Sequence, residues 1–171
     1  MWIEILKYTI PAVLVVLVTY LLLNLLFKNE AERRNFELKK ANNTTVTPIR
    51  LKAYERLMLL MERIHPNRVI VNKVEAGMNC FELQQVLLND LRREFEHNLS
   101  QQIYVSSELW ESIKDAYENV IQLINTCASQ CQAEESAAKL ATMIIKLYDS
   151  VDETALDVAM QVLKDEVKEI I

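Results

Sequence analysis

The sequence predicts an all-α protein, in which an N-terminal transmembrane helix is followed by a small cytoplasmic helical bundle of about five helices. Three observations predict this class. A stretch of 20 residues near the N-terminus is uncharged, the 171 residues include one glycine and three prolines, and apolar side chains recur at three- and four-residue spacing over most of the rest. Strands joined by hairpins need turn residues that are almost absent here.

The uncharged stretch runs from Tyr8 to Phe27. As a helix, it is long enough to cross a hydrocarbon core of about 30 Å. Trp2 and Tyr8 are placed where aromatic side chains meet lipid headgroups. A cleaved signal peptide would need a basic start, a shorter apolar stretch and a small-residue cleavage site, and this segment has none of them. A buried core helix is the remaining alternative.

Basic residues predict the orientation of the span. Lys7 alone precedes it, whereas five basic residues follow it closely: Lys28, Arg33, Arg34, Lys39 and Lys40. Because positive charge is retained on the cytoplasmic side, we expect the C-terminal side to be cytoplasmic. Cys80, Cys127 and Cys131 are odd in number and lack a framework spacing, as expected for reduced thiols.

The chain then divides into four predicted parts. Residues 1–7 form a short periplasmic N-terminus, residues 8–27 the transmembrane helix, residues 28–48 a juxtamembrane basic stalk and linker, and residues 49–171 the cytoplasmic helical domain. The stalk contains strong helix formers, and the segment NNTTVTP ends it because Asn and Thr compete for backbone hydrogen bonds.

Five amphipathic helices are predicted in the domain from apolar periodicity. They cover residues 49–64, 79–98, 108–130, about 137–148 and about 152–170. We expect Pro66 to close the first, Asn79 with Glu82 to cap the second, and Asp152 to cap the fifth. Residues 65–78 read as a loop with a short extended piece at Val69–Val71, and residues 99–107 read as a connector. We expect the five helices to pack as an antiparallel bundle or as an irregular helical array.

Charge is unevenly distributed along the domain. Residues 49–100 carry eight basic and seven acidic side chains, whereas residues 101–171 carry five basic and thirteen acidic ones. The acidic distal half and the basic stalk suit a molecule whose near end is attracted to anionic membrane lipid. An ordinary solvated surface is the alternative. Direct nucleic-acid binding is not expected, because the domain has no basic face that could neutralise phosphates.

The only two histidines belong to Glu-x-x-His motifs, Glu62 with His65 and Glu94 with His97. Two such motifs with two further glutamates can hold a di-iron or di-manganese centre in a helical bundle. However, His65 directly precedes Pro66 at a helix end, and both motifs come before any helix that supplies a bare glutamate. We therefore predict no metal and no cofactor. No phosphate-cradling loop or nucleophile elbow is present, so no small-molecule substrate is evident and the chain is not expected to be an enzyme.

Tyr104 and Trp110 are the candidate docking residues, because aromatic side chains favour interface cores. The alternative is that residues 99–110 form an apolar connector that packs into its own bundle.

Three segments carry a family resemblance: RLKAYERLMLLMERIHPN, EFEHNLSQQIYVS and LINTCASQ, which follow a span beginning with WIEILKYTIPA. With them the chain resembles a family of short single-pass membrane proteins of Bacteroidota bacteria whose function is uncharacterised. The resemblance covers nearly the whole chain. It implies a bacterial inner-membrane protein and assigns no catalytic or ligand residues.

These observations favour a non-catalytic adaptor or accessory subunit, which docks a helical domain at an inner-membrane assembly. Its partner would be another inner-membrane or cytoplasmic protein, or a second copy of the chain. A peripheral-stalk-like subunit shares the anchor, but its stalk is one long helix, and Pro48 and Pro66 interrupt this chain. A metal-dependent helical-bundle enzyme is the third hypothesis.

Overall fold

The computed structural model describes residues 19–20, 23–24, 26–28, 30, 33–34, 37, 46–71 and 73–170. The chain divides into two compact units, Met1–Val46 and Thr47–Ile171. The described residues of the first unit before Val46 are all helical, and Arg33 Nε lies 3.0 Å from a carboxylate oxygen of Glu37, one turn later. Among the described residues, no helix is both long enough and apolar enough to cross a membrane. Most of the predicted span lies outside them.

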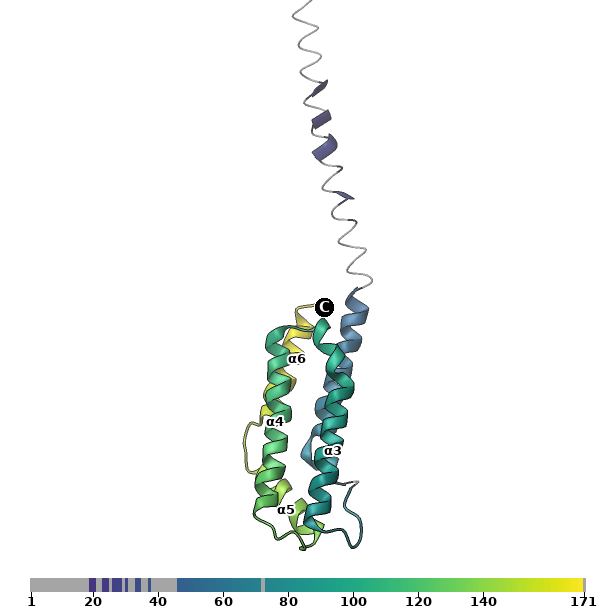
Figure 1. The fold of residues 1–171 in the computed structure, drawn as a ribbon. Coiled ribbons are helices and arrows are strands. Elements are labelled where there is room, and N and C mark those ends of the chain that lie inside the picture. Colours follow the sequence, from purple (N-terminus) through teal and green to yellow (C-terminus); the bar gives the residue numbers. More distant parts are fainter. Residues whose placement is uncertain are drawn as a thin grey trace, which may run out of the picture. The chain divides into compact units, whose positions relative to one another are not determined.

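The second unit is built from helices, which confirms the all-helical class (Figure 1). In its described residues there is no strand, only an isolated bridge between Asn79 and Ser136. A helix at residues 47–64 comes first. The others are α2 (Pro66–Val71), α3 (Cys80–Asn98), the 3₁₀ helix η1 (Leu99–Tyr104), α4 (Ser107–Ser129), α5 (Ala137–Asp149) and α6 (Ala155–Lys168).

The long helices pack side by side in antiparallel pairs. The 47–64 helix lies against α3, where Arg63 forms an ion pair with Glu94. Helix α4 packs against α3, α5 and α6, and the junction between α5 and α6 faces its middle (Figure 1). Short α2 lies against α5 and α3. The result is an antiparallel bundle in which each helix buries one face.

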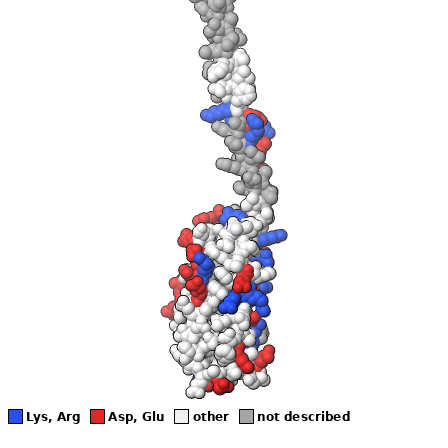
Figure 2. Space-filling model, viewed as in Figure 1, with Lys and Arg blue, Asp and Glu red and all other residues white. Residues whose placement is uncertain are grey.

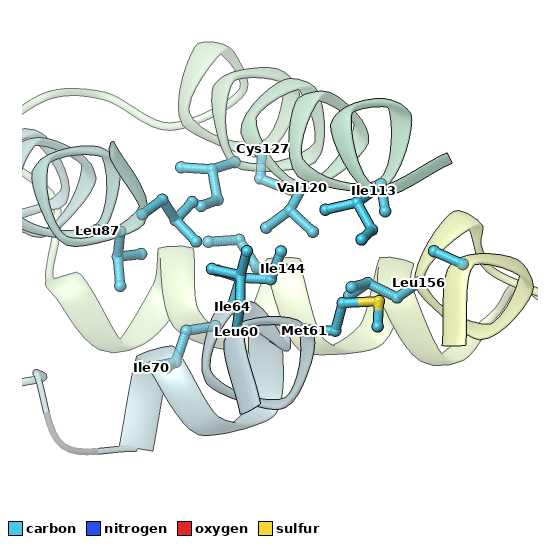
Figure 3. Packing of buried hydrophobic residues seen from close by; sticks show 14 of the residues in the cluster. Leu60, Met61, Ile64, Ile70, Leu87, Ile113, Val120, Cys127, Ile144 and Leu156 are labelled. Carbon is cyan, nitrogen blue, oxygen red and sulfur yellow. The ribbon is translucent and has the colours of Figure 1, made fainter. Parts of the chain in front are cut away.

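One hydrophobic core runs through the bundle. Figure 3 shows Leu60 and Ile64 from the 47–64 helix beside Leu87 of α3 and Ile144 of α5, with Cys127 of α4 nearby. The largest side chains with almost no exposed surface are Tyr54, Leu57, Leu60, Met61, Ile64, Leu83, Leu87, Leu91, Leu109, Ile113, Leu140 and Ile144. Burial of this apolar surface is the main force that holds the helices together.

Polar side chains cap the N-termini of two helices. Asn79 caps α3 as predicted, because its side chain accepts the Glu82 N–H while the Glu82 carboxylate accepts the Asn79 N–H. Thr154 caps α6 in the same reciprocal way with Asp157. The prediction that Asp152 caps this helix is therefore wrong by two residues. Each cap satisfies backbone N–H groups that would otherwise lack a partner.

Two predicted irregular segments contain helix instead. The first helix ends at Ile64, before Pro66, as predicted. Pro66 then begins α2 instead of a loop, because its missing N–H and fixed φ cost little at the start of a helix. The Val69–Val71 piece is thus helical, not extended, because this turn places Ile70 in the core. The predicted connector forms η1 over its first six residues. Pro48 lies within the first turn of the 47–64 helix, where we had expected the end of a linker.

Candidate functional site

A surface groove of about 490 Å³ lies between the 47–64 helix and η1, and we call it the η1 groove. Three of its apolar side chains are exposed to solvent: Ile103 is 73% exposed, Leu59 47% and Ile49 45%. It is lined by Ile49, Lys52, Ala53, Glu55, Arg56, Leu59, Ser100, Gln101, Ile103 and Tyr104. Apolar surface that is gathered in a concave site and rimmed by polar groups is typical of a binding surface.

One wall of the groove is a second stripe of the 47–64 helix. Ile49, Lys52, Arg56 and Leu59 follow one another at three- and four-residue spacing, so they share one face. This face is distinct from the buried stripe that contains Leu57. It presents two exposed cations between two apolar side chains.

The other wall, η1, is fixed to the bundle by hydrogen bonds. Arg50 Nε donates to the carbonyl oxygen of Tyr104 (3.0 Å), and Arg50 Nη2 donates to the Tyr54 hydroxyl (2.7 Å). The Tyr54 hydroxyl donates in turn to a carboxylate oxygen of Glu166 in α6 (2.7 Å). Residues far apart in the chain therefore hold the last residue of η1 in place.

Glu166 also holds the start of α4. Its carboxylate accepts the Ser106 N–H (3.0 Å) and the Ser106 hydroxyl (2.6 Å), and Arg50 Nη2 lies 3.4 Å away. We call Arg50, Tyr54, Tyr104, Ser106 and Glu166 the Glu166 clasp. It joins the 47–64 helix, both ends of the η1–α4 turn and α6 through one half-buried carboxylate.

The ionisation of the clasp follows from these contacts. Burial works to raise the pKa of Glu166, but hydrogen bonds from Ser106 and Tyr54 and the charge of Arg50 outweigh it and hold this pKa below its ordinary value. Burial, helped by the hydrogen bond to Glu166, raises the pKa of Tyr54 to about 12. At neutral pH the clasp therefore consists of an ionised carboxylate, a neutral phenol and a guanidinium.

The two predicted docking residues lie in different environments. Tyr104 is half-buried and lines the η1 groove. Trp110 belongs to the core instead: it is 8% exposed, and its ring stacks on Phe95 with the centroids 5.7 Å apart. Phe95 stacks in turn on Tyr117. Trp110 therefore offers a partner almost no surface, because its aromatic ring fills the space between α3 and α4.

The structure gives each residue of the two Glu-x-x-His motifs a different partner. Glu62 forms an ion pair with Arg68 (3.0 Å) and Glu94 one with Arg63 (3.2 Å), while His97 Nε2 lies 3.4 Å from Arg56 Nη2. The ring of His65 packs edge-on against Tyr148. Within the described part of the chain, no group of three or more His, Cys, Asp or Glu side chains is placed to hold a metal ion.

Of the predicted membrane-interface residues, Trp2, Tyr8, Lys39 and Lys40 lie outside the described residues. Lys28, Arg33 and Arg34 are described and helical.

A second hollow, of about 200 Å³, lies where the α5–α6 junction meets α4. Exposed Leu147 and Val151 line part of it. It is smaller than most ligand pockets, which begin at roughly 300 Å³. A hollow of about 620 Å³ beside Glu166 is larger than the η1 groove, but its lining is mostly polar and charged. We take the η1 groove as the candidate site because it gathers the exposed apolar side chains Ile49, Leu59 and Ile103.

The comparisons with known proteins give one match. A family model described as a family of unknown function, DUF7935, covers residues 1–170. The chain belongs to the DUF7935 family. No curated protein and no solved structure matches it. Membership of the DUF7935 family agrees with the expected uncharacterised family and assigns no activity.

Sequence reasoning identified Tyr104 but missed the groove around it. Ile49 and Leu59 lie off the buried stripe, and Ile103 lies in a segment read as a connector. The available signal was the second stripe of the 47–64 helix, at positions 49, 52, 56 and 59.

Proposed function

We propose that this member of the DUF7935 family is a non-catalytic adaptor in the inner membrane of a Bacteroidota bacterium. Residues 8–27 would anchor it with the N-terminus in the periplasm. The cytoplasmic domain would dock another membrane or cytoplasmic protein in the η1 groove. The observation that carries this proposal is the exposure of Ile103, Leu59 and Ile49 in a groove whose walls are fixed by the Glu166 clasp.

The groove indicates the chemistry of its partner. Apolar side chains of the partner would cover Ile49, Leu59 and Ile103, and Lys52 and Arg56 would pair with carboxylates. An amphipathic helix with apolar residues at three- and four-residue spacing and acidic residues beside them supplies both. Such a groove needs no conformational change in this chain, because η1 is already held by Arg50.

The charge distribution favours an acidic partner at this side of the domain. Figure 2 shows more basic side chains along the right flank of the bundle and more acidic ones along the left flank, with further acidic side chains at the lower end. Residues 49–100 contribute eight basic and seven acidic side chains, whereas residues 101–171 contribute five basic and thirteen acidic ones, so the first of these two segments is the less acidic. Opposite charges would guide the encounter and orient the partner.

The alternatives receive less support. A peripheral stalk would extend as one continuous helix, whereas residues 47–170 form separate helices that pack on each other. A metal-dependent enzyme would use the two Glu-x-x-His motifs, and their carboxylates are engaged by Arg68 and Arg63.

Replacing Ile103 tests the adaptor function. We expect Ile103→Asp to reduce the amount of partner that co-purifies from the native host in mild detergent by about ten-fold or more, because a carboxylate would be buried against an apolar and acidic surface. The variant should fold normally, since Ile103 is 73% exposed. Quantitative mass spectrometry of the purified membrane fraction measures the change.

Val71 provides the matched control. It is a β-branched residue at the end of another short helix, it is 72% exposed, and it does not line the groove. Val71→Asp should retain the partner. Equal recovery with both variants would contradict docking in the groove, and recovery of only further copies of the same chain would replace the adaptor with a self-associating protein.

A further inference from the structure

The cysteines gather at one end of the bundle. Cys80 is the first residue of α3, Cys127 lies in the last turn of α4, and Cys131 follows that helix. All three are free thiols. Cys80 and Cys131 are neighbours although 50 residues separate them in the chain: the Cys80 thiol bonds to Ser136, five residues after Cys131, and Cys80 raises the pKa of the Cys131 thiol.

Backbone contacts hold this pair in place. The Cys80 N–H donates to the Glu135 carbonyl oxygen (2.7 Å), and the Ala137 N–H donates to the Met78 carbonyl oxygen (3.0 Å). These bonds tie the start of α3 to the start of α5. The Cys80 thiol also donates to the Ser136 carbonyl oxygen (3.3 Å), and the Cys131 thiol contacts the Met143 sulfur at 3.5 Å. Both sulfur atoms are thus positioned on a fixed frame.

The two thiols differ in access. Cys131 is half-buried, whereas Cys80 is only 2% exposed. An external reagent would therefore reach Cys131 first, and Cys80 would react only with a sulfur already attached there. Cys127 is 1% exposed, so an external reagent would not reach it directly.

One cation acts on both thiols. Lys139 forms an ion pair with Glu135 (Nζ to oxygen 2.6 Å), and its charge interacts with Cys80 and with Cys131. Burial and the contact with Cys80 raise the pKa of the Cys131 thiol, while Lys139 opposes this increase. Since the thiolate is the nucleophile, Lys139 promotes the reaction of Cys131, and a higher pH accelerates it.

We propose that Cys80 and Cys131 are a redox-active pair that low-molecular-weight disulfides convert into an intramolecular disulfide. The Cys131 thiolate attacks one sulfur of the reagent, whose S–S bond breaks, and the first leaving thiolate takes up the proton that Cys131 lost. The Cys80 thiolate then attacks the Cys131 sulfur of this mixed disulfide, and a second reagent thiol leaves with the proton from Cys80. Two electrons pass from the two cysteines to the reagent, which is reduced to two thiols.

The disulfide would add a covalent link between two parts of the bundle. It would close a loop that contains all of α3, η1 and α4, and it would join the first turn of α3 to the segment after α4. Cross-linking so long a loop restricts the unfolded chain, so the oxidised protein should melt about 5–10 °C above the reduced one. The disulfide would thus be a reversible covalent link between the start of α3 and the segment after α4.

Treatment of the full-length protein in mild detergent with oxidised glutathione tests the proposal. We expect a product that has lost two hydrogens and yields a Cys80–Cys131 linked peptide in non-reducing mass spectrometry. Cys127→Ala should form this link as fast as the native chain. Cys80→Ala should stop at a glutathione adduct on Cys131, whereas Cys131→Ala should leave Cys80 unmodified.

Lys139→Gln gives a test that does not depend on removing a buried side chain, because Lys139 is exposed. It should slow the reaction about three-fold at neutral pH. A link that involves Cys127, a link between two chains, or three thiols that remain free after prolonged exposure to the reagent would overturn the proposal.

Discussion

Leu57→Ala is expected to lower the free energy of unfolding by about 2–5 kcal/mol, because it removes three buried carbon atoms and leaves a cavity among helices that cannot fully close. Leu57 has no exposed surface and lies on the core stripe of the 47–64 helix. Urea denaturation of the full-length protein in mild detergent, followed by far-ultraviolet circular dichroism, measures the loss.

Leu59 is the internal control for this prediction. It is the same residue type two positions later on the same helix, but it is 47% exposed in the η1 groove. Leu59→Ala should change the free energy of unfolding by only about 0.5–1 kcal/mol. If the two variants lost equal stability, the assignment of one face to the core and the other to the groove would be incorrect.

Glu166→Ala is expected to cost about 3 kcal/mol, since it leaves the Ser106 N–H, the Tyr54 hydroxyl and the Arg50 guanidinium without their shared acceptor. The neighbouring Asp165 provides the comparison. Its carboxylate is exposed and pairs with Lys168 one turn away (2.7 Å). Asp165→Ala should cost much less than Glu166→Ala, because water screens an exposed ion pair. Denaturation under the same conditions measures both, and similar losses would argue against the Glu166 clasp.

The pH dependence of stability provides a second measure of the clasp. The folded-state pKa of Glu166 is below its ordinary value, so its contribution is present above the unfolded pKa of about 4.3 and is lost as the pH falls through the folded pKa. Stability of the native chain should therefore decline more steeply than that of Glu166→Ala between about pH 5 and pH 3. Other carboxylates with lowered pKa values, such as Asp157, contribute equally to both proteins. Parallel curves would contradict this prediction.

Apolar periodicity was sufficient to predict the long helices. The stripe of Leu109, Ile113, Val120 and Ile124 is buried in α4, and Tyr54, Leu57, Met61 and Ile64 are buried in the 47–64 helix. The N-cap at Asn79 was also predictable, because capping depends on residues only three positions apart. These features follow from local sequence alone.

Features that depend on tertiary contacts were not predictable. The Val69–Val71 run has the composition of a strand, and only the packing of Ile70 in the core selects the helical turn. Phe81 is an apolar residue in the first turn of α3 but is 55% exposed, because the face that packs includes Cys80, Leu83 and Leu87. One helical face differs from its neighbour by a small rotation, which a short apolar pattern does not specify.

In the candidate site, too, local features were predictable and tertiary contacts were not. Tyr104 was identified because its type is common in interfaces, and the same reasoning selected Trp110, which the bundle uses in its core. In the sequence, nothing distinguishes Glu166 from other acidic residues near helix ends. Only the fold brings the Tyr54 hydroxyl, 112 residues earlier in the chain, within 2.7 Å of its carboxylate. No pattern of local spacing contains that contact.

A pair of reporters fused after Ile171 most directly tests the claim that residues 8–27 anchor a cytoplasmic helical domain. In the native host, a fluorescent protein that matures in the cytoplasm should fluoresce in the membrane fraction, and an alkaline phosphatase that folds in the periplasm should be inactive. The five basic residues that follow the span predict this result. Active phosphatase, or a fluorescent fusion that remains in the soluble fraction, would contradict it.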